Sequence, residues 1–295
     1  MTEDWENGGF GIYIHWPFCT AKCPYCDFNS HVRSNINQKQ WLKAYLNEIK
    51  RVSEKTSNRI LNSVFFGGGT PSLIEPSIIG DVLNEIQKHW KTKNNFEVTL
   101  EANPGSVDAK NFKAYKEAGV NRTSMGIQSL NTKDLKALGR THTVEEALAA
   151  FEIARQNFKA VSFDLIYARQ NQNISQWEKE LSLALSLEAS HMSLYQLTIE
   201  QGTAFGDRYN RGLLKGLPND DTSADMYDLT LSLCEDRGLV SYEVSNYAHE
   251  GYESIHNLIY WRYGDYIGIG PGAHGRLTID GKKYATETVL SPEAW

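Results

Sequence analysis

The stretch IHWPFCTAKCPYCDFNS, residues 14–30, places Cys19, Cys23 and Cys26 within eight residues. The whole chain of 295 residues holds one further cysteine, Cys234. Thiolates at the spacing C-x3-C-x2-C suit soft metals and iron–sulfur clusters. Three cysteines on one loop can hold three irons of a [4Fe–4S] cluster, which leaves the fourth iron open to an external ligand.

Two other interpretations of these cysteines remain open at the level of sequence. A structural zinc site normally has four protein ligands, and His15 or His31 could supply the fourth. Alternatively, the three cysteines could be unrelated buried thiols. A disulfide framework is not expected, because four cysteines are too few for a chain of this length. Cys234 lies in an apolar helical pattern and is expected to be a buried structural thiol.

The overall composition is that of an ordinary globular protein, with 41% hydrophobic and 22% charged residues. The net charge of −6 argues against a nucleic-acid binder with a broad basic surface. No apolar run reaches the length of a membrane helix, and the acidic N-terminus lacks the apolar region of a secretory signal. We therefore expect a cytoplasmic protein without a transmembrane segment, which leaves peripheral membrane association open.

Strands and helices alternate along most of the chain. Strands are predicted at residues 11–16, 63–68, 96–103, 122–128, 160–167 and 191–198. Helices are predicted at residues 37–52, at 75–90, up to Gly119, from a Thr143/Glu146 capping box, from a Ser175/Glu178 capping box, and from about Asp221 to 238. Six such units predict a parallel sheet with helices packed outside it.

The strands themselves are polar on one face. In residues 96–101, apolar side chains alternate with Glu97, Thr99 and Glu101. A parallel sheet covered on both faces is apolar on both, so a polar face favours a barrel interior that reaches a ligand cavity.

Residues 239–295 differ in character and are expected to form a C-terminal extension to a barrel domain of residues 1–238. This segment is rich in Gly, Tyr and Trp, and Asp280-Gly281 predicts a type I′ hairpin turn. Ser291 and Pro292 are typical of a helix start, so residues 291–295 predict the first turn of a helix. Because the sequence stops there, we expect the chain to be truncated.

In a barrel, functional side chains gather at the C-terminal ends of the strands. The residues predicted at those ends are the cysteine loop, the GGGTP run at 67–71, Glu101, Gln128, Asp164 and Thr198. The GGGTP run lacks the Gly-Lys-Ser/Thr ending of a phosphate loop. The two carboxylates suit a cationic ligand or ribose hydroxyls, unless they cap helices or pair with Arg122, and Arg140 suits a carboxylate.

The motif C-x3-C-x2-C, with Tyr25 before its last cysteine, resembles that of the radical S-adenosylmethionine (SAM) family. The resemblance implies an α/β fold, the partial (β/α)6 TIM-like barrel of that family. It also implies a [4Fe–4S] cluster on Cys19, Cys23 and Cys26 whose open iron binds the amino and carboxylate groups of SAM. Reduction of such a cluster cleaves SAM to methionine and a 5′-deoxyadenosyl radical.

Within that family the chain resembles the oxygen-independent coproporphyrinogen III oxidase group, through segments such as FFGGGTPS, SMGIQSLN and YIGIGPGAHG. This group includes both the oxidase and the heme chaperones of the HemW type. The oxidase has another cysteine two residues after its third cluster ligand, where this chain has Phe28. The chaperone motif HNxxYW is present as residues 256–261.

The resemblance therefore implies a heme chaperone that binds heme and passes it to acceptor apoproteins. Coproporphyrinogen III oxidation in heme biosynthesis is the alternative activity, and a zinc-stabilised binding module is a third. The expected SAM residues are Tyr13, Tyr25, Gly68, Gly69, Thr70, Glu101, Gln128, Arg140, Asp164, Thr198 and His274. His256 could bind heme iron, with Tyr260 and Trp261 against the porphyrin, unless these aromatic residues simply pack under the barrel.

The sequence departs from this family in two places. After the FDLIY segment the family usually has Gly-Leu-Pro-Gly-Gln-Thr, whereas residues 168–173 read Ala-Arg-Gln-Asn-Gln-Asn. The loop beside Asp164 is therefore expected to be altered. The family also continues into a C-terminal helical domain beyond the last residue of this chain.

Overall fold

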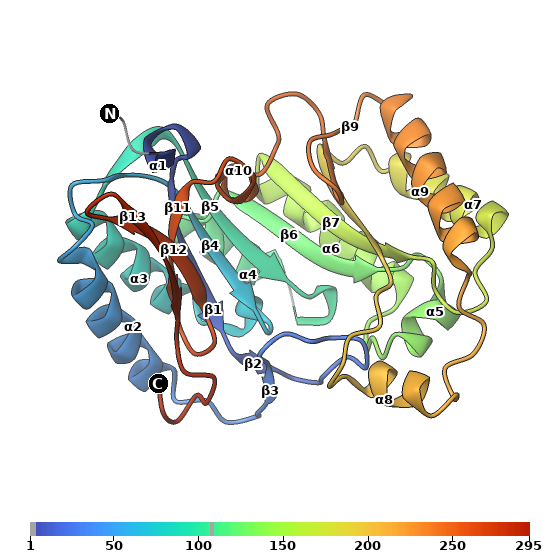
Figure 1. Cartoon of the computed structure of the whole chain (residues 1–295), viewed down its shortest axis with the longest axis horizontal. Coiled ribbons are helices and arrows are strands. Elements are labelled where there is room, and N and C mark those ends of the chain that lie inside the picture. The colour runs from blue at the N-terminus through green and yellow to red at the C-terminus, as the bar shows by residue number, and fades with distance from the viewer. Residues whose placement is uncertain (1–3, 107–108) are drawn as a thin grey trace.

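The computed structural model, which describes residues 4–106 and 109–295, is built on one curved sheet of eleven strands (Figure 1). Six consecutive neighbours are parallel, in the order β1-β4-β5-β6-β7-β8. They are β1 (Phe10–Trp16), β4 (Ile60–Gly68), β5 (Lys91–Ala102), β6 (Arg122–Gln128), β7 (Ala160–Tyr167) and β8 (His191–Gln196). The predicted parallel β-α architecture is confirmed, although β4 and β5 begin three and five residues earlier than expected.

The larger helices lie along the outside of the curved sheet, where α2 packs against α3 and α7 packs against α9 (Figure 1). The helices are α1 (Asp4–Gly8), α2 (Gln38–Ser53), α3 (Pro76–His89), α4 (Ala109–Glu117), α5 (Thr132–Ala137), α6 (Val144–Asn157), α7 (Ile174–Leu185), α8 (Ala204–Asn210), α9 (Asp220–Glu235) and α10 (Ile255–Trp261). Ile14 of β1 and Leu100 of β5 are fully buried in the core between sheet and helices. Their neighbours Tyr13 and Glu101 border cavities on the inner side, as the alternation predicts.

The C-terminal segment adds strands to both edges of the same sheet. Strand β11 (Asp265–Ile269) lies parallel to β1, and the hairpin of β12 (His274–Ile279) and β13 (Lys282–Glu287) extends that edge. On the opposite edge, β10 (Asn246–Ala248) pairs with β8 and with β9 (Val240–Ser241). The domain boundary at residue 238 stays a prediction.

The hairpin turn follows the prediction, whereas two predicted helix starts are wrong. Asp280 and Gly281 have φ angles of 50° and 73°, as a type I′ turn requires. Helix α7 is capped by Asn173, which forms a capping box with Gln176, and not by Ser175. Residues 291–295 form a turn closed by bonds to the Ser291 carbonyl, and no helix forms there.

Candidate functional site

The cysteine loop begins directly at the C-terminal end of β1 and is closed at its base by a short strand pair. Strand β2 (Phe18–Cys19) runs parallel to β3 (His31–Val32), so both ends of the loop are fixed. Within the loop the Cys26 N–H donates to the Cys23 carbonyl at 3.2 Å. All three thiols border one cavity of about 140 Å³.

Contacts on two sides hold this loop in place. On one side the Phe205 N–H of α8 donates to the Pro24 carbonyl at 2.8 Å, and the Phe205 ring contacts Tyr25. On the other side the Asn29 side chain donates to the carbonyls of Pro271 and Leu290, each at 2.9 Å. The loop is thus tied to the C-terminal segment through Asn29, a residue that no sequence motif singles out.

The same cavity collects most of the residues that the sequence predicts for SAM. They come from the ends of β4, β5, β6 and β7 and from the loops beyond them. Those that border the cavity are Tyr25, Gly68, Gly69, Thr70, Glu101, Gln128, Arg140 and Asp164. Ser124 also borders the cavity, although it is not among the predicted residues. Its position on the inner face of β6, two residues from Gly126, is the feature of the sequence that could have predicted this.

The glycine run brings backbone close to this cavity at a conformation that needs glycine. Gly68 has a φ angle of +111°, and a Cβ atom there would lie 2.6 Å from the His15 ring. Its N–H donates to the Glu101 carboxylate at 3.1 Å. The run therefore positions the carboxylate as well as opening space.

The two carboxylates of the cavity are electrostatically unsatisfied. Burial, and then the charge of Asp164, raise the pKa of Glu101 to about 8. Burial raises the pKa of Asp164 to about 6, although its hydrogen bond from Ser124 at 3.2 Å works in the other direction. Neither carboxylate forms an ion pair with any residue in the described ranges. A cationic ligand would relieve both shifts.

Arg140 faces the cysteines from across the cavity. Its Nη1 donates to the Cys23 sulfur at 3.3 Å and its Nη2 to the Gly126 carbonyl at 2.9 Å. Its Nε is buried without a hydrogen-bond partner. A guanidinium with an unused donor at the wall of a cavity is suited to a ligand carboxylate.

The donor set fits an iron–sulfur cluster. Within residues 4–106 and 109–295, no three His, Cys, Asp or Glu side chains converge on a single ion position. A cubic cluster does not need such convergence, because each thiolate binds a different iron. Burial raises the pKa of the Cys19 and Cys26 thiols, so metal binding there must release protons. Three thiols can hold a cluster. The two unpaired carboxylates and the arginine beside them suit a co-ligand that carries positive groups as well as a carboxylate.

Three predicted SAM residues lie elsewhere. Tyr13, whose hydroxyl contacts His15 Nδ1 at 3.1 Å, borders the two neighbouring cavities. His274 borders the larger of these two. Thr198 is exposed and borders neither the cysteine cavity nor these two neighbouring cavities.

The structure places the predicted heme residues on α10, where His256 and Tyr260 border a cavity of about 240 Å³ that Glu101 and Asp164 also border. His256 is fully buried, and its Nδ1 and Nε2 contact Ser63 Oγ at 2.8 Å and Tyr260 Oη at 2.7 Å. Burial lowers the pKa of His256 to about 3. Trp261, by contrast with the buried His256, has 57% of its surface exposed. Both ring nitrogens of His256 are engaged, so neither has a free lone pair or proton to offer.

Glu97 explains why α10 sits there. Its carboxylate accepts the backbone N–H groups of Ile255 and His256 at 3.0 and 3.1 Å, which caps the start of the helix. Alternation placed Glu97 on the inner face of β5, but nothing local in the sequence pairs it with a helix more than 150 residues later. The Glu97 carboxylate therefore fixes the start of α10 against the inner face of the sheet.

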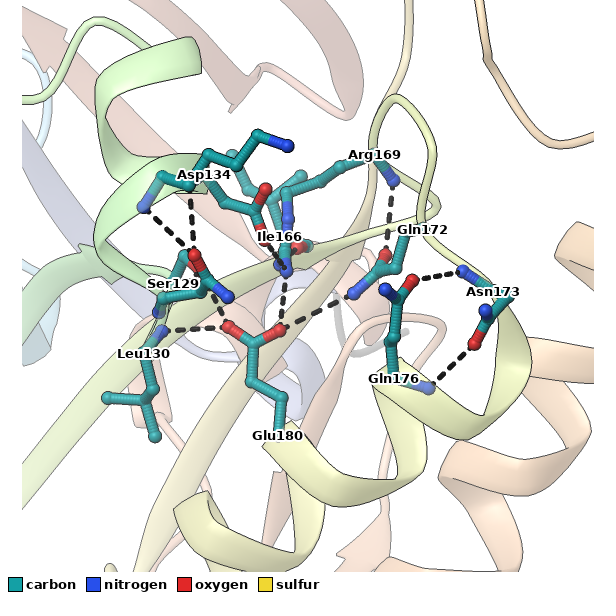
Figure 2. Close-up of polar contacts among 11 residues, drawn as sticks. Ser129, Leu130, Asp134, Ile166, Arg169, Gln172, Asn173, Gln176 and Glu180 are labelled. Atoms are coloured by element: carbon teal, nitrogen blue, oxygen red, sulfur yellow. Dashed lines mark hydrogen bonds and ion pairs between the residues drawn. The ribbon is translucent and has the colours of Figure 1, made fainter.

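The altered loop at 168–173 is fastened by a buried arginine (Figure 2). Arg169 Nη2 forms ion pairs with Glu180 of α7 and, at 2.9 Å, with Asp134 of α5. Glu180 also accepts the N–H of Leu130 at 2.7 Å and the hydroxyl of Ser129 at 2.6 Å. This network lies away from the cavity that Asp164 borders, so the missing glycines and proline do not remove Asp164 from it.

The sequence profile of the radical SAM superfamily matches residues 13–184. Heme chaperone HemW of Haemophilus influenzae is 43% identical over 91% of this chain and 70% of its own length. The chain belongs to the HemW family of the radical SAM superfamily. HemW of Escherichia coli is 39% identical over 96% of this chain and 75% of its own length.

A relative from Danio rerio, named mitochondrial radical S-adenosyl methionine domain-containing protein 1, is 39% identical over 96% of this chain. The chain spans 65% of that relative's length. Escherichia coli coproporphyrinogen III oxidase (HemN) has the same fold, with a TM-score of 0.80 at 20% identity over 95% of this chain and 67% of that one. Membership of this superfamily implies a [4Fe–4S] cluster and SAM. Within the described ranges, no helix has the length and apolarity needed to cross a membrane.

Proposed function

We propose that this protein is a heme chaperone, which binds heme and transfers it to acceptor apoproteins. The main support is that this chain is 43% and 39% identical to two bacterial proteins that are named heme chaperone HemW. Phe28 supports the same choice, because the oxidase group is expected to have a cysteine there. Its likeness to HemN is a likeness of fold alone.

We further propose that Cys19, Cys23 and Cys26 hold the cluster and that SAM occupies the adjoining cavity. When bound, the cluster supplies an open iron for SAM and a source of single electrons. Glu101 and Asp164 would attract the positive groups of SAM, and Arg140 would hold its carboxylate. Gly68, Gly69, Thr70, Tyr25 and Gln128 would line the remaining wall. Tyr13, Thr198 and His274 rest on family resemblance alone for this role.

The proposal is tested by adding hemin to the purified protein and following the Soret band. Loaded protein is then mixed with a heme-free globin, and transfer is measured by the change to the globin spectrum. Failure of the unmodified protein to bind hemin would overturn the proposal. Formation of protoporphyrinogen from coproporphyrinogen III, in reduced protein with SAM, would replace it with the oxidase activity.

A further inference from the structure

A second, larger cavity lies between the cysteine loop and the C-terminal strands. It has a volume of about 750 Å³, within the range of about 300–1,000 Å³ that is usual for small-molecule sites. Phe28 and His31 border it from the cysteine loop, Tyr260 from α10, and Tyr266 and His274 from β11 and β12. Phe28 also borders the cysteine cavity, so the two spaces adjoin.

The lining of this cavity suits a flat aromatic ligand that carries carboxylates. Phe28 is 55% exposed and Tyr260 is 39% exposed, although large aromatic side chains are usually buried. Lys22 lies on the cavity wall, and so does Asp27. Arg276 is not on the wall, but it pairs across the strands with Tyr266, so both project from the same face of the sheet. A metalloporphyrin with two propionates matches the aromatic surface, with Lys22 and Arg276 as the cations near its edge.

The hydrogen bonds of the nearby histidines distinguish one imidazole as able to bind iron. His15 is engaged at Nδ1 by Tyr13 and at Nε2 by the Asn29 carbonyl, at 3.1 and 2.9 Å. His31 Nε2 contacts Asn29 Oδ1 at 3.2 Å, and both ring nitrogens of the buried His256 are occupied.

His274 differs from these histidines. Its side chain is 59% exposed, and its Nδ1 lies 3.6 Å from the Glu287 carboxylate. No residue in the described ranges bonds its Nε2. This contact is longer than a hydrogen bond, so it leaves the imidazole ring free to turn. His274 therefore offers an exposed ring whose Nε2 is available to a metal.

We propose that heme binds in this cavity with His274 Nε2 as the iron ligand. Phe28 packs against the porphyrin face, and Lys22 and Arg276 attract the propionates. The inference rests on the proposed function, because it assigns the site at which the chaperone holds its cargo. It replaces His256, the imidazole that the motif at 256–261 suggests.

The site is mechanically joined to the cysteine loop. Gly272, two residues before β12, has a φ angle of +79°, and a Cβ there would lie 2.5 Å from the Asn29 side chain. Asn29 in turn bonds Pro271 and is three residues from Cys26. Heme in this cavity would therefore contact the same loop that holds the cluster.

The test is a hemin titration of the full chain and of two single variants, His274→Gly and, as a control histidine that does not border this cavity, His249→Ala. We expect His274→Gly to weaken hemin affinity at least about tenfold, and His249→Ala to leave it near that of the unmodified protein. Added imidazole should restore the Soret spectrum of the glycine variant by filling the gap. Iron-free protoporphyrin IX should bind the unmodified protein and His274→Gly equally, because only the iron bond is lost.

Each other outcome has a defined meaning. If the unmodified protein binds hemin and His274→Gly binds it equally well, this inference is wrong and the proposed function stands. An equal loss in both variants, or a loss that imidazole does not restore, would also overturn the assignment. If the unmodified protein binds no hemin, the proposed function fails and the site fails with it. Phe28→Ala should weaken both hemin and protoporphyrin IX, and retention of both would exclude this cavity.

Discussion

Replacing Glu101 with Gln should stabilise the protein without SAM while weakening its binding of SAM. Glu101 ionises with an ordinary pKa of 4.5 when unfolded, but its pKa in the fold is about 8. A raised carboxyl pKa favours the fold fully below pH 4.5, and this contribution is lost as the pH rises through 8. The amide of Gln stays neutral at every pH and still accepts the hydrogen bond from the Gly68 N–H.

The size of the effect follows from the two pKa values. At pH 7, which is about 2.5 pH units above the pKa of the unfolded carboxyl, ionisation stabilises the unfolded chain by about 3 kcal/mol. The folded carboxyl is still mostly protonated at this pH and gains almost nothing. Water in the cavity screens part of this, so we expect a gain of about 1–3 kcal/mol for Glu101→Gln. The gain should fall at pH 5 to about a quarter of its value at pH 7, and it should level off above pH 8.

Urea unfolding of protein without cluster and SAM, at pH 5 and pH 8.5, measures this gain. Glu117→Gln is the matched control, because Glu117 is 68% exposed and its contact with Lys113 is long. Calorimetric titration of reconstituted protein with SAM supplies the second half of the test. A variant that is less stable at pH 8.5, or a gain that does not depend on pH, would refute the electrostatic argument. Unchanged SAM affinity would remove Glu101 from the proposed site.

Two further substitutions test the framework around the site. Arg169→Met should cost about 3–5 kcal/mol of unfolding free energy, because it leaves the Glu180 carboxylate buried without its cation. The double variant with Glu180→Met should recover most of this loss. A cost of Arg169→Met below about 1 kcal/mol would show the ion pair to be dispensable. Glu97→Ala should cost about 1–3 kcal/mol, because it leaves the N–H groups at the start of α10 unpaired. Glu97→Gln, which keeps an acceptor oxygen, should cost less, and equal losses in the two variants would contradict the capping role.

The fold was predictable because its signals are local and repeated. Alternation within the strands and apolar periodicity in the helices predict the parallel sheet, and the polar inner face predicts a cavity above it. The wrong helix start at α7 has a local cause as well. Asn173 and Ser175 are both good N-caps, and the extended backbone at Asn173 decides between them.

The candidate site was predictable only in part. Cys19, Glu101 and Arg140 come together because strand ends meet at one edge of a barrel, which a sequence pattern can express. The surroundings of each histidine could not be predicted in this way. Whether an imidazole is buried against Ser63 or paired with Glu287 depends on contacts between segments far apart in the chain.

Iron and sulfide content after anaerobic reconstitution tests the central claim, that three cysteines hold a cluster with one iron open to SAM. We expect about four irons and four sulfides per chain, and an electron paramagnetic resonance signal of the reduced cluster that changes when SAM is added. Replacing Cys19, Cys23 and Cys26 with alanine should abolish uptake, whereas Cys234→Ala should retain it, because Cys234 is fully buried in the core. Equal uptake by the triple variant, or a reduced cluster whose signal ignores SAM, would contradict the account.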